Sequence, residues 1–232
     1  MQIRNKSFKK RFRIVNNSGK RDKDLCEFFE FYKTTKIKNK KFDDFHKKLN
    51  YPKIICSINM GRSASQFFFE NLNKKLNLIC APNLFNSRSK TKYAKHKNFE
   101  EFFFYSLNKI NYNNVIFFEI SPKRFLKLIN FLEKKTQKKF NYHFIFSEDV
   151  VRQTFSFFIA MSTNIWNNFS FKDRSKLSTK LNYSNIRIKL KEILKKIIFY
   201  EKKIFSFLKN YKYINQKFEN IIKNSSKEEK KF

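Results

Sequence analysis

The chain has 232 residues, of which 41% are hydrophobic and 32 are phenylalanine, and this composition excludes an intrinsically disordered protein. Lys and Arg total 52 against 19 Asp and Glu, so the formal net charge is +33, which favours nucleic acids, anionic membranes or acidic glycans as partners. Because Lys, Asn, Ile and Phe are abundant together while Gly and Pro are rare, we interpret most of this charge as a compositional bias at tolerant surface positions.

The cysteines and histidines are few and widely spaced, which argues against a disulfide framework and against a zinc-binding pattern. They are Cys26, Cys56, Cys80, His46, His96 and His143. The apolar runs are short and interrupted by Lys or Asn, so neither a membrane-spanning helix nor a signal peptide is expected. We therefore expect a cytoplasmic protein in a reducing compartment, with no metal site.

Three regions are expected along the chain. Residues 1–50 are polar and rich in lysine, which predicts a loosely attached basic arm that is partly helical. Residues 51–222 have the alternating apolar runs of a folded domain, and residues 223–232 are expected to form a frayed basic tail.

Within the folded domain, short apolar runs typical of buried strands alternate with segments of helical periodicity. Strands are expected in residues 53–58, 77–83, 114–120 and 142–147, and helices in residues 63–76, 122–135, 149–166 and 185–208. Ser121 and Pro122 occupy the N-cap and the first turn of the second helix. This alternation indicates an α/β fold of three layers, with a central parallel sheet flanked by helices.

The stretch CSINMGRSASQFF, residues 56–68, joins the first strand to the first helix and contains one of only two glycines. Small residues let an anion approach the unpaired N–H groups at a helix start, where the helix dipole is positive. The candidate loop residues are Gly61, Arg62, Ser63, Ala64, Ser65 and Gln66. The Walker pattern and GxGxxG are both absent, so an ordinary turn is the alternative on spacing alone.

A second feature lies on the helix expected over residues 149–166. Small and polar residues recur there at steps of three or four and form one stripe, while Phe, Val and Ile dominate the other faces. The stripe consists of Asp149, Gln153, Ser156, Ala160, Thr163 and Asn167. A solvated face of this protein would be rich in lysine, and the stripe has none. It therefore indicates a ligand or a hydrogen-bonded interior network.

The two segments together resemble the bacterial trehalose 2-sulfotransferase-like family of carbohydrate sulfotransferases. Its first signature is a strand followed by Arg-Ser-Gly-Ser-Thr and a helix, and residues 62–66 read Arg-Ser-Ala-Ser-Gln. Its second signature runs Asp-x-x-x-Gln-x-x-Ser-x-x-x-Ala-x-x-Thr-x-x-Trp, and residues 149–166 match it at each spacing, ending on the single tryptophan. The resemblance extends over residues 53–221, where KFENI is similar to a Tyr-Glu-Asp-Leu segment.

The resemblance implies a P-loop-like fold and transfer of a sulfuryl group from 3′-phosphoadenosine-5′-phosphosulfate (PAPS) to a hydroxyl, usually of a carbohydrate. It implies that the loop containing Gly61 and Ala64 holds the 5′-phosphosulfate through Arg62, Ser63, Ser65 and Gln66. Ser156 would contact the 3′-phosphate. Arg62 would also serve catalysis, because positioning and charge stabilisation account for most of such a reaction.

The chain departs from this pattern at three places. Ser147 and Glu148 stand where the family has an arginine, and Ala81 replaces the carboxylate expected to act as the base. Glu119 ends a segment that reads Gly-Val-Lys in the family. His96 is a weak candidate for the base, together with Glu100 and Glu101, which are otherwise read as exposed charges on a helix.

Two other functions remain open at this stage. The first is a catalytically degenerate sulfotransferase-fold protein that binds without transferring, because the base and one arginine are missing. The second is a basic nucleic-acid-binding protein, although Lys is spread along the whole chain rather than gathered in one segment. The sequence also leaves a homo-oligomer open.

Overall fold

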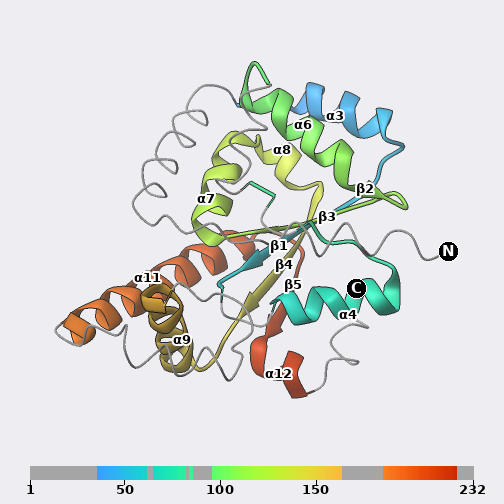
Figure 1. Ribbon diagram of the computed structural model, residues 1–232. Helices are drawn as coiled ribbons and strands as arrows, with labels where there is room; N and C mark the ends of the chain where they lie inside the picture. Colours follow the sequence, from blue (N-terminus) through green and yellow to red (C-terminus); the bar gives the residue numbers. More distant parts are fainter. Residues whose placement is uncertain (1–35, 62–64, 82–83, 86–95, 164–184, 224–232) are drawn as a thin grey trace.

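The computed structural model describes residues 36–61, 65–81, 84–85, 96–163 and 185–223. The sheet strands are β1 (Lys53–Asn59), β2 (Asn111–Tyr112), β3 (Val115–Ile120), β4 (Phe140–Phe146) and β5 (Tyr213–Lys217). The helices are α3 (Asn39–Lys48), α4 (Ser65–Leu76), α6 (Phe99–Ile110), α7 (Pro122–Phe131), α8 (Lys134–Gln137), α9 (Val150–Thr163), α11 (Ile186–Leu208) and α12 (Phe218–Lys223). Figure 1 shows helices on both sides of the sheet. The expected α/β architecture with a central sheet between helical layers is confirmed.

The sheet has the order β2-β3-β1-β4-β5, and all pairs except β2–β3 are parallel. From β1 the chain continues to β3 on one side, whereas from β4 it continues to β5 on the other side. The carboxyl ends of β1 and β4 therefore flank a topological switch point, which is where open α/β sheets bind ligands.

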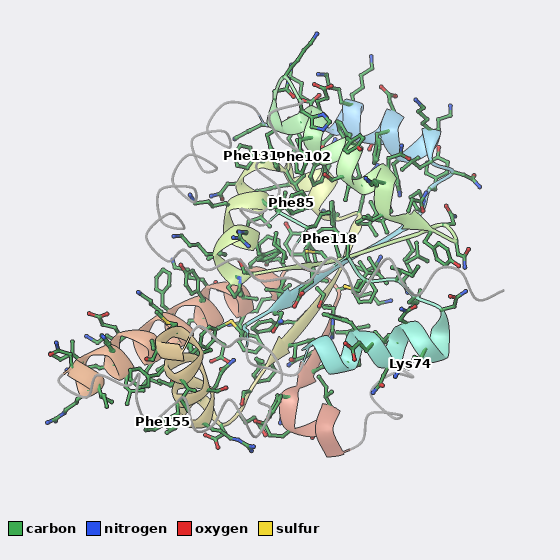
Figure 2. The ribbon with its side chains drawn as sticks, viewed as in Figure 1. Lys74, Phe85, Phe102, Phe118, Phe131 and Phe155 are labelled. Carbon is green, nitrogen blue, oxygen red and sulfur yellow. The ribbon has the colours of Figure 1, made fainter. Side chains whose placement is uncertain are left out.

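Alternating residues of the buried strands divide the core into two parts. One face of the sheet, with Ile54, Cys56 and Ile58 of β1, packs under α3, α6, α7 and α11. Figure 2 shows Phe85, Phe102 and Phe118 gathered in this layer, where the ring of Phe85 lies edge-on to that of Phe118 with centroids 5.7 Å apart. The opposite face, which includes Ile55, forms a smaller cluster with Phe68 and Leu72 of α4 and with α12. Phenylalanine therefore supplies much of the apolar area that stabilises both layers.

Residues 36–50 contribute to this core rather than lying apart from it. Ile37 and Phe42 are fully buried, and the Ile37 N–H donates to the carbonyl of Phe131 at 2.8 Å. The Asn39 side-chain oxygen accepts from both the N–H and the hydroxyl of Thr136. The packed unit thus includes the last part of the segment assigned to the basic arm.

The expected strand over residues 77–83 is wrong in its described part, because residues 77–80 pair with no strand and Ala81 makes only an isolated bridge with Phe118. β2 pairs with Val115 and Ile116 of β3, and Ala81 bonds the next part of the same edge, at Phe117 and Glu119. Pro82, which follows, has no N–H to extend a ladder.

The expected helix over residues 122–135 is divided into α7 and α8. The chain is extended at Leu132, and the side-chain amide of Gln137 donates to the carbonyls of Ile129 and Leu132. These bonds satisfy carbonyls at the end of α7 and stop the helix there. β5 and α12 were not expected from the sequence.

A buried polar chain links three strands on the α4 side of the sheet. The hydroxyl of Ser57 lies 2.8 Å from Nδ1 of His143, and Nε2 of His143 lies 2.5 Å from the side-chain oxygen of Gln216. The Gln216 side-chain oxygen accepts a hydrogen bond from Nε2–H of His143. In the neutral ring, Nδ1 then accepts a hydrogen bond from the Ser57 hydroxyl. All three residues are fully buried, and the chain fixes β1, β4 and β5 relative to one another at the switch point.

Gln216→Ala is expected to lower the free energy of unfolding by about 1–3 kcal/mol, because it removes the side-chain oxygen that accepts from Nε2–H of the buried His143. The control is Asn215→Ala, which changes an exposed residue of the same strand and should cost little. Urea unfolding followed by circular dichroism measures both variants. Equal losses in the two variants would contradict a role for the polar chain.

Candidate functional site

The candidate site lies where β1 ends, at the switch point of the sheet. β1 ends at Asn59, and the Met60 N–H donates to the carbonyl of Ile145 on β4 at 3.3 Å. The chain then turns at Gly61 and enters α4 at Ser65. The loop residues Arg62, Ser63 and Ala64 lie outside the described residues, as do the side chains of Ser65 and Gln66.

Gly61 is required by its backbone conformation and by its close packing. Its φ is +75°, a region that side-chain-bearing residues rarely adopt. A Cβ added there would lie 2.6 Å from Cζ of Phe157 on α9. The Asn59 side-chain oxygen accepts the Gly61 N–H at 2.8 Å, which fixes the first residue of the turn.

Gln153 joins the second sequence feature to the first. Its side-chain amide donates to the Gly61 carbonyl at 2.8 Å, and the residue is 2% exposed. Its oxygen Oε1 is buried and has no hydrogen-bond partner among the described residues. A buried acceptor without a partner costs free energy, so this atom is suited to a donor group on a ligand.

From Gln153 to Ala160 the stripe on α9 faces the protein interior, whereas Asp149 at its start is exposed. Gln153 and Ala160 are buried and Ser156 is half-buried. Asp149 accepts the Arg152 N–H at 2.8 Å and so caps the start of the helix. The side chain of Thr163 and residues 164–184, which include Trp166 and Asn167, lie outside the described residues. The solvent-facing side carries large apolar residues, among them Phe155 (Figure 2).

Glu119 on β3 is a candidate site residue that the motifs did not identify as such. It is 6% exposed, and its carboxylate accepts from the Asn59 amide at 2.5 Å. Asn59 thus bridges the carboxylate to Gly61. The Glu119 N–H also donates to the carbonyl of Ala81 at 2.9 Å, so this carboxyl-bearing residue lies beside the position where the expected base is missing. A single acidic residue inside the apolar run VIFFEI was the signal in the sequence.

Cys80 lies near Glu119 and is not suited to act as a nucleophile. Burial raises the pKa of its thiol well above the ordinary value, and the negative charge of Glu119 adds to the effect. The thiolate, which is the nucleophilic form, is therefore scarce at neutral pH.

Glu148 and Ser147, which stand where the sulfotransferase signature has an arginine, have different surroundings. Glu148 forms an ion pair with Lys217 of β5 and is exposed. Ser147 is buried and donates to the Glu219 carboxylate at 2.6 Å, and the same carboxylate accepts the N–H groups of Glu148 and Asp149. Burial acts to raise the pKa of Glu219, but these hydrogen bonds outweigh it and lower the pKa. Glu219 therefore stays ionised and ties α12 to the β4–α9 turn.

The other candidate bases lie on α6 or in the turn before it. The ring of His96 packs against Phe102 and Tyr105, with Nδ1 3.7 Å from the Glu101 carboxylate. Glu101 accepts the Lys97 N–H, and Glu100 forms an ion pair with Lys41 at 2.7 Å. The ring contacts, hydrogen bonds and ion pairs just described join these residues to α6, to its N-terminal turn and to α3. The structure brings Gln153, Asn59 and Glu119 to Gly61 instead.

No protein-family model matches the chain, and no curated protein sequence matches it significantly. Among the described residues, no group of three His, Cys, Asp or Glu side chains is arranged to hold a metal ion. The helices within that part of the chain are also too short or too polar to cross a membrane. A functional assignment therefore depends on the residues and on their geometry.

The double-mutant cycle of Gly61→Ala and Phe157→Ala separates the two constraints on the loop. Gly61→Ala alone is expected to destabilise the protein by about 2–4 kcal/mol, because a positive φ and a collision with the Phe157 ring add together. In the Phe157→Ala background only the conformational cost of about 1–2 kcal/mol should remain. Thermal unfolding of the four proteins measures the coupling, and strict additivity would contradict the close approach of α9.

Glu219→Gln is expected to lower stability by about 1 kcal/mol at pH 7, because it removes the charge that accepts three hydrogen bonds. The lowered pKa of Glu219 means that its contribution is present above the ordinary value of 4.5 and is lost as the pH falls through the folded-state pKa. The difference from the wild type should therefore shrink in urea titrations at acid pH. Asp44→Asn, which removes an exposed carboxylate of α3, is the control, and a gap that widens in acid would refute the assignment.

Proposed function

We propose that the protein is a PAPS-dependent sulfotransferase that transfers a sulfuryl group to a hydroxyl. The observation that supports this proposal most directly is the hydrogen bond from Gln153 to the Gly61 carbonyl. It joins the two segments that resemble the sulfotransferase signatures, at the edge of the sheet where α/β proteins bind nucleotides.

The residues present suit the donor. Arg62, Ser63, Ser65 and Gln66 would hold the phosphosulfate as a P-loop-like segment, with help from the N–H groups at the start of α4. Ser156 follows Gln153 by one turn on the same side of α9 and would take the 3′-phosphate. The unpaired Oε1 of Gln153 accepts a hydrogen bond, and a nucleotide offers hydroxyl and amino donors.

Glu119 is proposed as the general base in place of the carboxylate missing at Ala81. The donor supplies the sulfuryl group and a phosphate leaving group. The acceptor oxygen bonds to sulfur as the bond from sulfur to the bridging phosphate oxygen breaks, and that oxygen keeps the electron pair. Glu119 takes the hydroxyl proton, while Arg62 stabilises the charge on the leaving phosphate. Because the Glu148 carboxylate pairs with Lys217, it does not need to face the nucleotide.

Titration calorimetry with 3′-phosphoadenosine 5′-phosphate tests the donor site, and saturable binding at one site is expected. Arg62→Ala should weaken it by about 2 kcal/mol, because a charge-assisted bond to phosphate is lost. Glu119→Gln should keep this affinity but lower sulfate transfer from labelled PAPS by about 100-fold or more. Folded protein that shows no binding at millimolar nucleotide would overturn the proposal.

The same transfer assay distinguishes the alternatives for the base and for the function. Loss of transfer in His96→Ala but not in Glu119→Gln would reassign the base to His96. Nucleotide binding without transfer to any of a broad panel of hydroxylated acceptors would identify a catalytically degenerate binding protein instead.

A further inference from the structure

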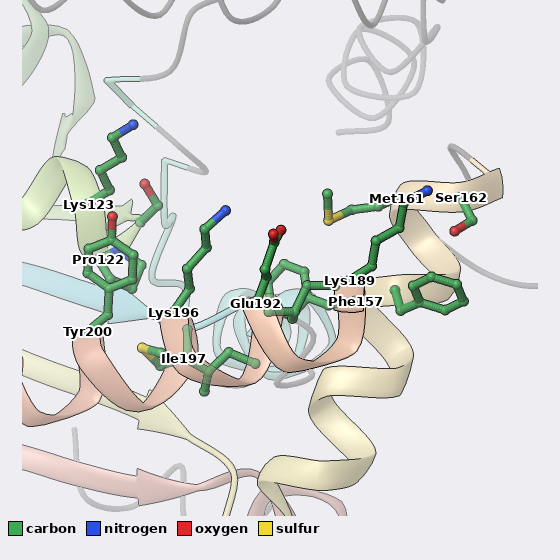
Figure 3. Close-up of a pocket in the computed structure, with 14 residues that line it drawn as sticks. Pro122, Lys123, Phe157, Met161, Ser162, Lys189, Glu192, Lys196, Ile197 and Tyr200 are labelled. Atoms are coloured by element: carbon green, nitrogen blue, oxygen red, sulfur yellow. The ribbon is translucent and has the colours of Figure 1, made fainter. Parts of the chain in front are cut away.

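A cavity of about 520 Å³ opens next to the proposed donor loop, between α9, α11 and the start of α7 (Figure 3). Met60, which follows β1, and Phe157, whose ring lies against Gly61, form its wall on the side of the loop. This volume is within the range of pockets that bind small molecules. The cavity therefore adjoins the place where an acceptor hydroxyl would have to reach the donor.

The walls of the cavity are mainly apolar. The apolar lining residues are Met60, Pro122, Phe157, Phe158, Met161, Ile193 and Ile197. Of the described lining residues, only Ser121, Ser162 and Tyr200 are polar and uncharged. A neutral sugar would leave most of its hydroxyl groups without partners against these walls, and each unpaired group costs free energy. The lining thus favours an apolar ring system over a neutral carbohydrate.

The charged groups of the cavity are mostly positive. Lys123 comes from α7, and Lys189 and Lys196 come from α11, where they are separated by two turns. Figure 3 shows Lys123 and Lys196 extending in the same direction, with Glu192 between Lys196 and Lys189 as the single carboxylate of the described lining. Lys189 and Lys196 are exposed and form no ion pair with any described residue. The rim therefore complements a negative charge.

We propose that this cavity binds the acceptor and that the acceptor is an amphiphilic anion, a molecule with a hydroxyl group, an apolar ring system and a negative charge. The acceptor role rests on the proposed sulfotransferase function, whereas the binding itself does not. The rings contact Phe157, Phe158 and Ile197, and the anion lies at the lysine rim. The Glu119 side chain lies on the α4 side of the sheet, whereas the cavity lies on the side of α7 and α11. The acceptor hydroxyl therefore extends past the carboxyl ends of the strands, beside Gly61, to reach Glu119.

The probe is 6-hydroxynaphthalene-2-carboxylate, which combines the three features and is fluorescent. Its methyl ester keeps the rings and the hydroxyl but removes the charge, and trehalose represents a neutral sugar. Binding is measured with the full-length protein at low and high salt, in the absence of nucleotide. We expect the ester to bind about tenfold more weakly, the carboxylate to weaken with salt, and trehalose not to compete.

Matched variants locate the charge and the walls. The double variant Lys189→Gln/Lys196→Gln should weaken the carboxylate by about tenfold and the ester hardly at all. Lys191→Gln/Lys195→Gln removes the same charge from exposed positions of α11 that do not line the cavity, and it should change little. Met161→Glu places a negative charge in the wall and should also weaken binding about tenfold. Val151→Glu is its control, since both residues are 60% exposed on α9.

The outcomes are distinguishable. Equal affinity for the acid and the ester, or equal losses in both lysine pairs, would overturn the proposal. Displacement of the bound naphthoate by trehalose would overturn it as well. If the naphthoate binds as expected and 3′-phosphoadenosine 5′-phosphate does not bind, the cavity remains an anion site and its acceptor role fails together with the proposed function. If both bind, mass spectrometry should detect the sulfated naphthoate after incubation with PAPS.

Discussion

The approach of α9 to the end of β1 is the contact on which the rest of the site depends. At Gly61 the two segments come so close that a single methyl group would collide with the ring of Phe157. The Gln153 amide uses this proximity to bond the Gly61 carbonyl, two residues beyond the end of β1. Because β1 is the central strand, this contact ties α9 to the middle of the sheet, in addition to its packing against α11.

The acidic residues near the carboxyl edge of the sheet are held by specific partners. Glu119 is bonded by Asn59, Glu148 pairs with Lys217, and Glu219 is bonded by Ser147 and two backbone N–H groups. These partners fix the positions of the three carboxylates. The carboxylates of Glu148 and Glu219 are also engaged in local ionic and hydrogen bonds. Glu119 differs from the other two because its recorded side-chain partner, Asn59, is the residue that also bonds Gly61. The bridge through Asn59 therefore holds the Glu119 carboxylate in place beside Gly61.

The sequence predicted those features that follow from local patterns. Runs of Ile and Phe identified β1, β3 and β4, because a strand buried on both faces must be apolar throughout. β5 has the polar sequence YINQK and is held by its place beside β4 and by Gln216, so no local pattern revealed it. The segment 77–83 has the composition of a strand, but its described residues add only the bridge of Ala81 to the β3 edge, next to β2.

The candidate site was predictable in the same partial way. Gln153, Ser156 and Ala160 are spaced by three and four residues. Residues at this spacing lie on one face of a helix, so the sequence alone predicted that the three side chains share a face. The apolar run VIFFEI marked Glu119 as unusual, but its partner Asn59 could not be predicted, because the contact depends on the strand order that brings β3 beside β1. Long-range pairings of this kind leave no periodic signal in the chain.

The composition bias and the cavity have to be considered together. Lysine is so frequent that its presence on any surface needs no explanation, and by itself it identifies no partner. The apolar lining is different, since Met161 remains largely exposed to solvent on a helix whose polar stripe is turned inward. An apolar wall open to water is unfavourable unless something covers it. The lysines above such a wall would therefore select, among apolar molecules, those that carry a negative charge.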